Sequence, residues 1–280
     1  MNRELIAENI LHIFKECQGN IISSSDAICP EVAEVQMFET PLIGITSSDD
    51  ELFDKYKEEN VIGPWHMSPD EWLDGAKTVI SIFLPFTEAV KKNSRSCKHG
   101  PSPAWLHGRV EGQKFIDAYT AALCEWLTSQ GIRNCAPSID ARFKQVAAGK
   151  GMQEYECVNE KTYGSNWSER HAAYACGLGT FGLSKGIITE KGMAGRFTSI
   201  IIDKEIKPDT RPYSDVYEYC TKCGACIVRC PADAISMEQG KNHNICDAWL
   251  KEMKAAHAPR YGCGVCQTAV PCESRIPKRK

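Results

Sequence analysis

A run of four closely spaced cysteines is the most specific chemical feature of the sequence. Its spacing is C-x2-C-x2-C-x3-C-P, formed by Cys220, Cys223, Cys226, Cys230 and Pro231. Two-residue spacers in a tight, glycine-containing loop let three thiolates converge on three corners of a cubane cluster. The longer step directs the fourth cysteine elsewhere, and the proline blocks a regular continuation. Paired cysteines can also bind zinc, but four at this spacing before a proline favour iron–sulfur chemistry.

The cysteines downstream of this run supply the ligands that it lacks. In such a run the first three thiolates hold one cluster and the fourth reaches across to a second. One cluster then lacks one ligand and the other lacks three, and four more cysteines follow. We predict two [4Fe–4S] clusters, one on Cys220, Cys223, Cys226 and Cys272, the other on Cys230, Cys246, Cys263 and Cys266. The crossed positions of Cys230 and Cys272 follow from the run, whereas the division of the other downstream cysteines is open.

Length and charge limit the class of protein. The chain has 280 residues, enough for one large or two modest domains, and a formal net charge of −3. Nucleic-acid-binding proteins usually carry a basic stripe, and the basic residues at 275–280 are expected to form a solvated tail. The N-terminus has no basic-then-apolar signal pattern. The longest apolar stretch, residues 79–86, is far too short to span a bilayer. We therefore expect a soluble, cytoplasmic protein with no membrane partner.

The remaining cysteines show no ligand spacing. Fifteen cysteines would suggest disulfides in a small secreted protein, but this chain is neither small nor preceded by a signal. We expect the seven outside the cluster set to be mostly small buried hydrophobic residues in a reducing compartment: Cys17, Cys29, Cys97, Cys124, Cys135, Cys157 and Cys176. A cysteine-rich iron–sulfur protein also suggests an anaerobic host.

Helices and strands alternate upstream of the cysteine run. Apolar residues at helical spacing and capping patterns predict helices over 3–17, 68–75, 110–130 and 167–176. Short apolar runs predict strands over 41–46, 78–84, 132–137, 187–189 and 197–202. Ser68 with Glu71, and Asn166 with Glu169, have the spacing of capping boxes. The polar segment 92–108 is expected to be a long loop. The pattern predicts an α+β (α/β-like) domain over 1–207 and a cluster-binding domain over 208–280.

A glycine-rich segment lies between these two parts. Gly177-Leu178-Gly179-Thr180-Phe181-Gly182 matches G-x-G-x-x-G. A dinucleotide-binding loop follows a strand and opens a helix, whereas this one follows a predicted helix and leads towards a strand. A helix C-cap with a tight turn would explain it. Three glycines also allow a backbone to pass close to a flat ligand, and we predict a ligand-contacting loop.

Several segments taken together resemble the superfamily of epoxyqueuosine reductases and reductive dehalogenases. They are Glu169-Arg170 with the glycine-rich segment, Gly-Met-Ala-Gly-Arg-Phe at 192–197, Ile-Ile-Ile-Asp at 200–203, and the cysteine run. Cys246-Asp-Ala-Trp-Leu250 and Gly262-Cys-Gly-Val-Cys266-Gln267 look like that family's distal cluster ligands. The resemblance is specific over about 160–272 and looser upstream, at 41–44, 71–80 and 112–113.

This resemblance implies a nitroreductase-like, cobalamin-binding domain followed by a bacterial-type module with two [4Fe–4S] clusters. Such proteins bind the corrinoid base-off and reduce it. The protein positions the cobalt, conducts electrons to it and supplies a proton. The sequence contains no D-x-H-x-x-G pattern for His-on corrinoid binding, and His66, His107 and His171 are expected to be packing or surface residues. The family pattern implies cofactor contacts from Gly177, Leu178, Gly179, Thr180, Gly182, Met193, Ala194, Arg196 and Phe197. A flavin in the same domain is the alternative.

The sequence also departs from the family pattern. Epoxyqueuosine reductases have an aspartate as proton donor six residues before the glutamate of Glu-Arg, and Tyr163 occupies that position here. Reductive dehalogenases use a tyrosine, so Tyr163 is the candidate acid, with Arg170 or Arg196 stabilising its phenolate. Packing in a loop is the other interpretation of Tyr163. The spacing from Cys266 to Cys272 is longer than the usual x3. The chain ends eight residues after Cys272, without the helical extension of tRNA-acting relatives, which weighs against tRNA.

These features predict an enzyme, an iron–sulfur and cobalamin-dependent reductase. Two [4Fe–4S] clusters would pass electrons to a corrinoid that reduces a small-molecule substrate. An external low-potential donor of the ferredoxin or flavodoxin type is the expected partner. The alternative is an electron-transfer or corrinoid-handling protein without its own substrate, which the missing aspartate favours. A tRNA epoxyqueuosine reductase is the third possibility. The sequence does not say which cluster faces the cofactor.

Overall fold

The centre of the molecule is an antiparallel sheet. The computed structural model describes residues 2–147 and 149–278, and the sheet has the order β1-β2-β8-β3. Its strands are β1 (Leu42–Ser47), β2 (Thr78–Pro85), β8 (Gly195–Ile202) and β3 (Asn134–Cys135). All residues of β2 are buried. Because each neighbouring pair is antiparallel, the domain is α+β, as predicted.

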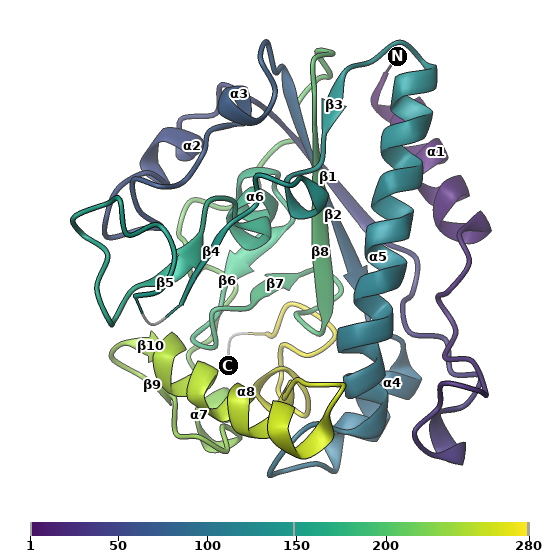
Figure 1. Ribbon diagram of the computed structural model, residues 1–280, viewed down its shortest axis with the longest axis vertical. Helices are drawn as coiled ribbons and strands as arrows, with labels where there is room; N and C mark the ends of the chain where they lie inside the picture. The colour runs from purple at the N-terminus through teal and green to yellow at the C-terminus, as the bar shows by residue number, and fades with distance from the viewer. Residues whose placement is uncertain (1, 148, 279–280) are drawn as a thin grey trace.

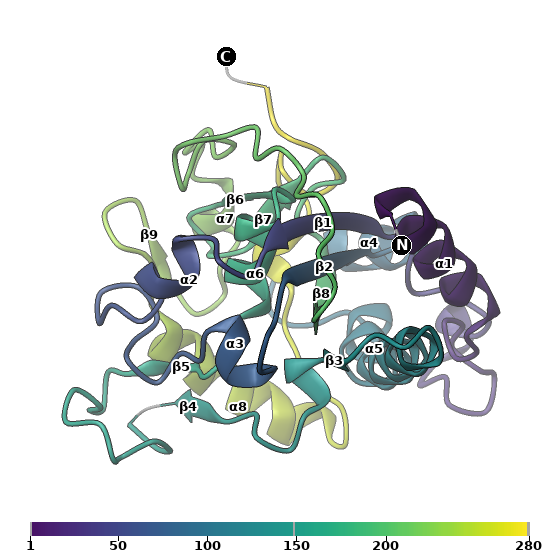
Figure 2. The same ribbon diagram turned by 90° about the horizontal axis from the view of Figure 1, so that it is seen from above.

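Helices cover both faces of this sheet (Figures 1 and 2). On one face α1 (Arg3–Glu16) and α5 (Pro103–Ser129) pack Ile10 and Phe115 against a core that includes Ile80 of β2. On the other face, α6 (Glu169–Ala175) and the short helices α2 (Leu52–Lys55) and α3 (Pro69–Trp72) enclose a core with Val79 and Trp167. Successive residues of a strand point to opposite faces, so Val79 and Ile80 serve different cores.

Most predicted elements are confirmed to within a few residues, including α1, β1, α3, β2 and β8. The capping box of α3 is also confirmed, because the Ser68 amide donates to Glu71 at 2.6 Å and the Ser68 side chain receives the N3 amide. The strand predicted over 132–137 is shorter, since only β3 at Asn134–Cys135 pairs with β8. Asn166 does not cap α6. Its side chain instead accepts from the Lys144 amide and donates to the Arg142 carbonyl, each at 2.8 Å.

The prediction of a long loop over 92–108 is wrong. Helix α4 (Glu88–Arg95) extends into it, and α5 begins at Pro103. Ser102 caps α5 by accepting a hydrogen bond from the Trp105 amide at 3.1 Å, and proline suits the first helical position. Gly108 would weaken an isolated helix. Here a Cβ at Gly108 would lie 2.6 Å from the Phe86 ring, so tertiary packing requires the glycine.

The described residues also form three two-stranded antiparallel sheets: β4 (Gln145–Ala147) with β5 (Tyr163–Ser165), β6 (Gly179–Phe181) with β7 (Ile187–Thr189), and β9 (Ile235–Ser236) with β10 (Gly240–Lys241). Single 3-10 turns occur at Pro30–Val32, Pro137–Ile139 and Val265–Gln267.

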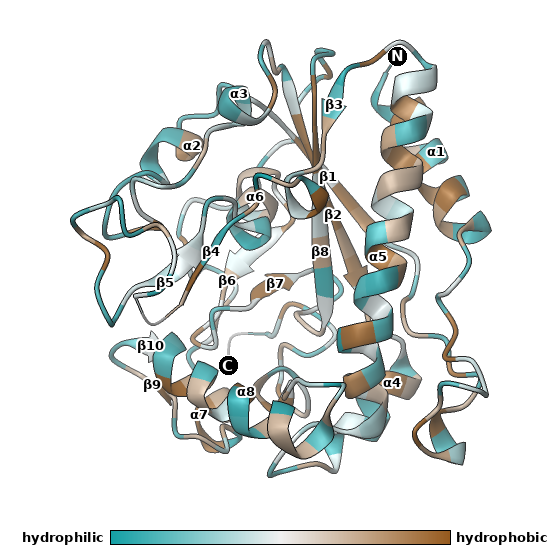
Figure 3. Cartoon of the chain, viewed as in Figure 1, coloured by the Kyte–Doolittle hydropathy of each residue, from teal (hydrophilic) through white to brown (hydrophobic). Residues whose placement is uncertain are grey.

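The cysteine-bearing segment packs against one end of the sheet and of α5 (Figure 1). It contains α7 (Ala225–Val228) and α8 (His243–His257). Arg229 joins the two parts of the chain, since its guanidinium donates to the Cys97 carbonyl at 2.9 Å and to the Val265 carbonyl at 3.0 Å. Figure 3 shows strongly hydrophobic residues along β1 and β7, whereas α8 is largely hydrophilic or pale. No helix within the described residues is both long and apolar enough to cross a membrane.

Candidate functional site

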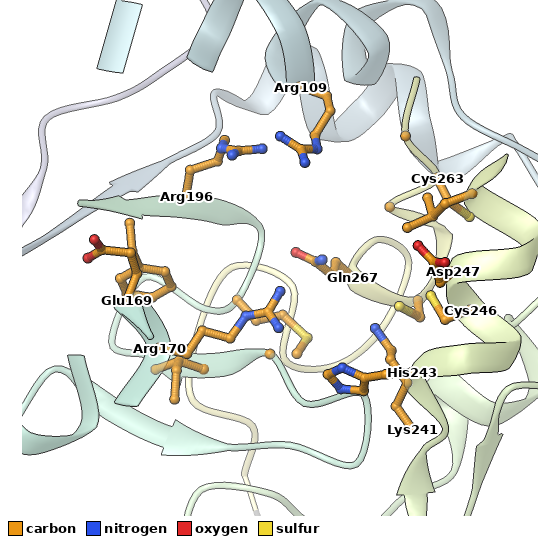
Figure 4. Close-up of a pocket in the computed structure, with 18 of the residues that line it drawn as sticks. Arg109, Glu169, Arg170, Arg196, Lys241, His243, Cys246, Asp247, Cys263 and Gln267 are labelled. Carbon is orange, nitrogen blue, oxygen red and sulfur yellow. The ribbon is translucent and has the colours of Figure 1, made fainter. Parts of the chain in front are cut away.

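A cavity of about 410 Å³ lies between the sheet domain and the cysteine-bearing segment. Helices α5 and α6 and strands β5 and β8 form one side of it, and α8 with the cysteine loops forms the other (Figure 4). Its polar and ionisable wall comprises Arg109, Tyr163, Ser165, Ser168, Glu169, Arg170, Arg196, Lys241, His243, Asp247 and Gln267. The cavity therefore joins the two predicted domains at one site.

The eight predicted ligand cysteines separate into two groups in space. Cys230, Cys246, Cys263 and Cys266 line the large cavity. A smaller pocket is lined by Cys220, Cys223, Cys226 and Cys272. The same two sets were predicted from the sequence to hold separate clusters, with Cys230 and Cys272 in crossed positions, and that ligand assignment stays a prediction. The two groups are close to each other. The pKa of Cys226 is raised to about 11, first by burial and then by the nearby Cys266 thiol of the other group.

Glycines allow these cysteines to approach the sheet domain. Gly264 has a φ of +73°, and a Cβ there would lie 2.0 Å from the Trp105 ring of α5. Gly192 has a φ of +77°, and a Cβ there would lie 2.3 Å from the Glu273 carbonyl oxygen. The tail is held at that point because the Met193 amide donates to the Cys272 carbonyl at 2.9 Å. Both glycines therefore lie where the segments that carry the predicted ligand cysteines approach the sheet domain.

The predicted ligand thiols do not surround one metal position within the described residues. Among the described residues, no three His, Cys, Asp or Glu side chains are grouped so that they could hold a metal ion. In a [4Fe–4S] cubane each thiolate binds a different iron, so its ligands need not converge on one atom. Burial raises the pKa of Cys272 to about 12 and that of Cys263 to about 11. Iron binding must therefore displace thiol protons.

Three arginines face the large cavity: Arg109 of α5, Arg170 of α6 and Arg196 of β8 (Figure 4). Arg196 donates a hydrogen bond to the Gln113 side-chain oxygen, and Arg109 lies over the Tyr261 ring with its Cζ 4.6 Å from the centroid. Within the described part of the chain none of the three forms an ion pair with a carboxylate. Burial and the charge of Arg109 lower the pKa of Arg196 to about 9.

Tyr163, the predicted acid, lies in the cavity wall at the start of β5. Its side chain is 43% exposed, and its ring meets that of His243 edge-on, with centroids 4.7 Å apart. Burial and the nearby Asp247 raise the pKa of the Tyr163 phenol, while Arg170 acts in the opposite direction. Burial lowers the pKa of His243 to about 3, so its ring is neutral. Arg170 is therefore the candidate cation for the predicted stabilisation of the Tyr163 phenolate.

Glu169 lies in an unusual environment. The capping box predicted for Asn166 and Glu169 gave no indication of it. Both carboxyl oxygens are buried without a hydrogen-bond partner among the described residues. Burial raises the pKa of Glu169 to about 7, a rise limited by the neighbouring Ser199 and Trp167. Those two residues bond each other at 2.9 Å. Figure 4 shows the carboxyl turned away from the arginines. The charged residues Arg109, Lys241 and Asp247 were also missed, since they belong to no local motif.

The glycine-rich segment is positioned mainly by the chain itself. Gly177, with a φ of +79°, ends α6, and the Leu178 amide donates to the Ala173 carbonyl at 3.0 Å, as in a Schellman motif. A Cβ at Gly179 would lie 2.1 Å from the Ile188 carbonyl oxygen. The Thr180 hydroxyl accepts a bond from the Tyr219 amide at 2.9 Å. These contacts fit the helix-cap alternative.

The predicted cofactor residues therefore lie in different places. Met193, Arg196 and Phe197 line the large cavity. Gly182 lines the smaller pocket beside Cys220. Ala194 is buried, and the described wall of the large cavity does not include it or Gly177, Leu178, Gly179 and Thr180.

The three histidines that were expected to be packing residues also lie outside the described cavity wall. His66 stacks on Trp167 with centroids 5.5 Å apart. His107 contacts Glu111 at 3.0 Å, and His171 contacts the Ser168 hydroxyl at 2.8 Å. Burial lowers the pKa of both His66 and His171 to about 3.

Comparisons with known proteins agree with this geometry. Residues 213–236 match the 4Fe-4S binding domain, while a comparison with curated protein sequences finds no match. The crystal structure of a selenomethionine-labelled epoxyqueuosine reductase is similar with a TM-score of 0.53 at 19% identity, covering 99% of this chain and 70% of that one. The epoxyqueuosine reductase from Streptococcus thermophilus gives 0.53 at 17% identity, covering 100% and 69%.

A reductive dehalogenase has the same fold over a smaller share of its length. The catabolic enzyme in complex with 3-bromo-4-hydroxybenzoic acid has a TM-score of 0.51 at 10% identity, covering 98% of this chain and 37% of that one. The chain is thus an iron–sulfur protein with a 4Fe-4S binding domain. Its fold is similar to the folds of epoxyqueuosine reductases and of a reductive dehalogenase, so the predicted resemblance is confirmed at the level of the fold, and the predicted fold class is confirmed.

Proposed function

We propose that the protein is a reductase in which two [4Fe–4S] clusters pass electrons to a corrinoid in the large cavity, where a small molecule is reduced. The observation that carries this proposal is the shared wall of that cavity. Cys230, Cys246, Cys263 and Cys266 line it together with Tyr163 and the arginines of the sheet domain. A ligand there would lie between a cluster and a candidate proton donor.

The two cysteine groups suggest an order for electron transfer. The cluster on Cys230, Cys246, Cys263 and Cys266 would be proximal to the cavity, whereas the other would be distal. Cys223 of the distal group is exposed, which suits entry of electrons from an external donor of the ferredoxin or flavodoxin type. Cys226 and Cys266 pack in the same small cluster of side chains and would lie between the two iron–sulfur clusters.

The cavity wall offers flat contact surface for part of a macrocycle, since a corrinoid is larger than a cavity of about 410 Å³ and would extend beyond it. Gly186, Gly195, Gly262 and Gly264 leave stretches of wall without side chains, and Trp105 and Phe197 supply aromatic surfaces. Ligand sites of about 300–1,000 Å³ are lined in this way by apolar surface with a few polar groups. A bound corrinoid would supply a strongly reducing cobalt centre. A flavin could use the same wall, so the visible spectrum of the bound cofactor has to distinguish them.

The chain's own residues would bind and orient the substrate and supply a proton to it. The Tyr163 phenol is protonated at neutral pH, as in an ordinary tyrosine, and burial raises its pKa further. Arg170 lies close enough to oppose that rise and would stabilise the phenolate left after proton transfer to the substrate. Trp105, Phe197 and Leu250 would limit access of water to the site.

Two other functions are distinguishable from this one. A corrinoid-handling or electron-transfer protein would need no acid, so Tyr163→Phe would then leave every measured rate unchanged. A tRNA substrate is suggested by one similar structure, an epoxyqueuosine reductase with an epoxyqueuosine-modified tRNA stem loop. The net charge of −3 gives no broad attraction for RNA, and a queuosine-formation assay would detect that activity.

The proposal is tested on anaerobically purified protein by its metal content and its titration with cobalamin. We expect about eight irons per chain from two cubane clusters and a shift of added cobalamin to a base-off spectrum. Failure to bind any corrinoid would exclude the cofactor assignment, and four irons would exclude the second cluster.

A further inference from the structure

The two arginines Arg109 and Arg196 face each other across the upper wall of the cavity (Figure 4). We propose that they form an oxyanion site for a ligand with a carboxylate or phosphate group on an apolar body. This proposal adds the chemical class of the substrate to the proposed function. It rests on that function only in taking the bound ligand to be the substrate.

The first argument is uncompensated positive charge. Arg109 is the strongest of the charges acting on Arg196 and opposes its protonated form. Three of the acids around the site are already engaged, and the carboxyl of a fourth, Glu169, is turned away from the arginines (Figure 4). Glu111 bonds Arg260 at 3.0 Å, Asp247 bonds Lys251 at 2.6 Å, and Asp117 accepts from Gln113 at 2.7 Å. Two like charges held together without a counterion destabilise the fold, and an oxyanion between them would relieve the repulsion.

The second argument is that both guanidiniums are already positioned. They come from two regular elements, α5 and β8. The Gln113 side chain accepts a hydrogen bond from Arg196, and the Tyr261 ring supports Arg109 at 4.6 Å. Planar guanidiniums match carboxylate and phosphate groups through paired hydrogen bonds. Fixing them in advance reduces the entropy lost on binding.

Charge neutralisation of the clusters is a different task that other residues can perform. The thiol groups of Cys246 and Cys266 are among the charges that act on Arg170, and Lys241 acts on Cys246. After burial, the largest electrostatic effects on Arg196 come from Arg109, Tyr261, Arg170 and Asp117, and no cysteine is among them. Arg109 and Arg196 are therefore directed at the cavity, whose nearby Trp105 and Phe197 suit an apolar body.

The test is a titration of the anaerobic holoprotein, followed by calorimetry, with benzoate, phenyl phosphate and the neutral analogue benzyl alcohol. We expect at least one anion to bind about tenfold or more tightly than benzyl alcohol, because hydrogen bonds to charged groups have about that effect. Arg109→Gln should weaken that anion at least about tenfold, and Arg109→Lys less. The control Arg275→Gln removes an exposed charge far from the cavity wall and should change nothing.

Iron content and circular dichroism of each variant establish that it is folded, and Arg196→Gln provides a second test if Arg109→Gln is not. The inference is overturned if neither anion binds, if Arg109→Gln and Arg275→Gln have equal effects, or if only an RNA stem loop binds in an Arg109-dependent way. Corrinoid binding without anion binding would remove this inference alone. Anion binding without corrinoid binding would remove the proposed cofactor and leave the oxyanion site.

One further arm identifies the source of the oxyanion. Cobalamin carries a phosphodiester in its nucleotide loop, and cobinamide lacks that loop. If Arg109→Gln weakens the small anion but neither corrinoid, the site binds the substrate, as proposed. If it weakens cobalamin but not cobinamide, the arginines hold the cofactor's own phosphate, and the substrate assignment is overturned.

Discussion

All eight residues of β2 are buried, whereas none of the fifteen residues of α8 is. Strand β2 lies in a sheet covered by helices on both faces. Helix α8 belongs to the cysteine-bearing segment, which has few buried apolar side chains. Ile235 and Cys266 form one small cluster there with Leu183 of the sheet domain, against Cys220, Cys226 and Cys230. The sheet domain is stabilised by apolar burial, while the cluster-binding segment would depend on iron ligation and on contacts with the sheet domain.

Removal of iron should give the largest difference between the two regions. We expect the iron-free protein to lose protection over residues 213–278, because a metal-held segment has little core of its own. The sheet domain should keep its secondary structure. Limited proteolysis with mass spectrometry, together with circular dichroism, measures both effects. Equal protection of 213–278 with and without iron would contradict the contrast.

Gly264→Ala should damage the boundary between the regions. A Cβ at this position would lie 2.0 Å from the Trp105 ring, and φ is +73°. We expect the proximal cysteines to be displaced and the iron content to fall by about four per chain. Gly131→Ala is the matched control, since its φ is +74° but a Cβ there meets nothing within 4 Å. If both variants lose iron equally, backbone strain rather than the Trp105 contact is responsible.

Ile82→Ala should separate stability from cluster binding. Ile82 is fully buried in the core shared by β2, α1 and α5, and such truncations destabilise proteins by about 2–5 kcal/mol. Denaturant unfolding of the sheet domain should show this loss, while the iron content of the folded protein stays unchanged. Leu5→Ala, at a side chain that is 43% exposed, should have a much smaller effect. Loss of iron from the folded Ile82→Ala protein would contradict this separation, because it would show that cluster binding depends on this core.

Glu169→Gln should have a smaller, pH-dependent effect. The pKa of Glu169 is about 7 in the folded protein and 4.5 ordinarily. Between these pH values the folded protein keeps a proton that the unfolded chain releases, so stability falls as pH rises from 4.5 to 7. The gain from glutamine should therefore be up to about 3 kcal/mol larger at pH 8 than at pH 4.5. Unfolding measured at both pH values should show this, and the exposed Glu125→Gln should not. A pH-independent gain would contradict a buried, titrating carboxyl.

Local patterns in the sequence predicted much of this structure. The spacing of the cysteine run depends on a few consecutive residues, so the two ligand groups could be anticipated from it. Apolar periodicity likewise predicted α1, β1 and β2. The start of α5 was missed because Gly108 is required by a distant contact with Phe86. Arg109 and Arg196 were not recognised as a pair because only the packing of α5 beside β8 brings them together. No local pattern encodes such a meeting.

The central claim, that electrons reach the large cavity through the proximal cluster, is tested by following reduction of bound cobalamin after adding a low-potential donor anaerobically. The wild-type protein should reduce the bound corrinoid. The variant Cys263→Ser, if it still binds cobalamin and retains the distal cluster, should not. Equal reduction rates in both proteins would contradict the proposed electron path.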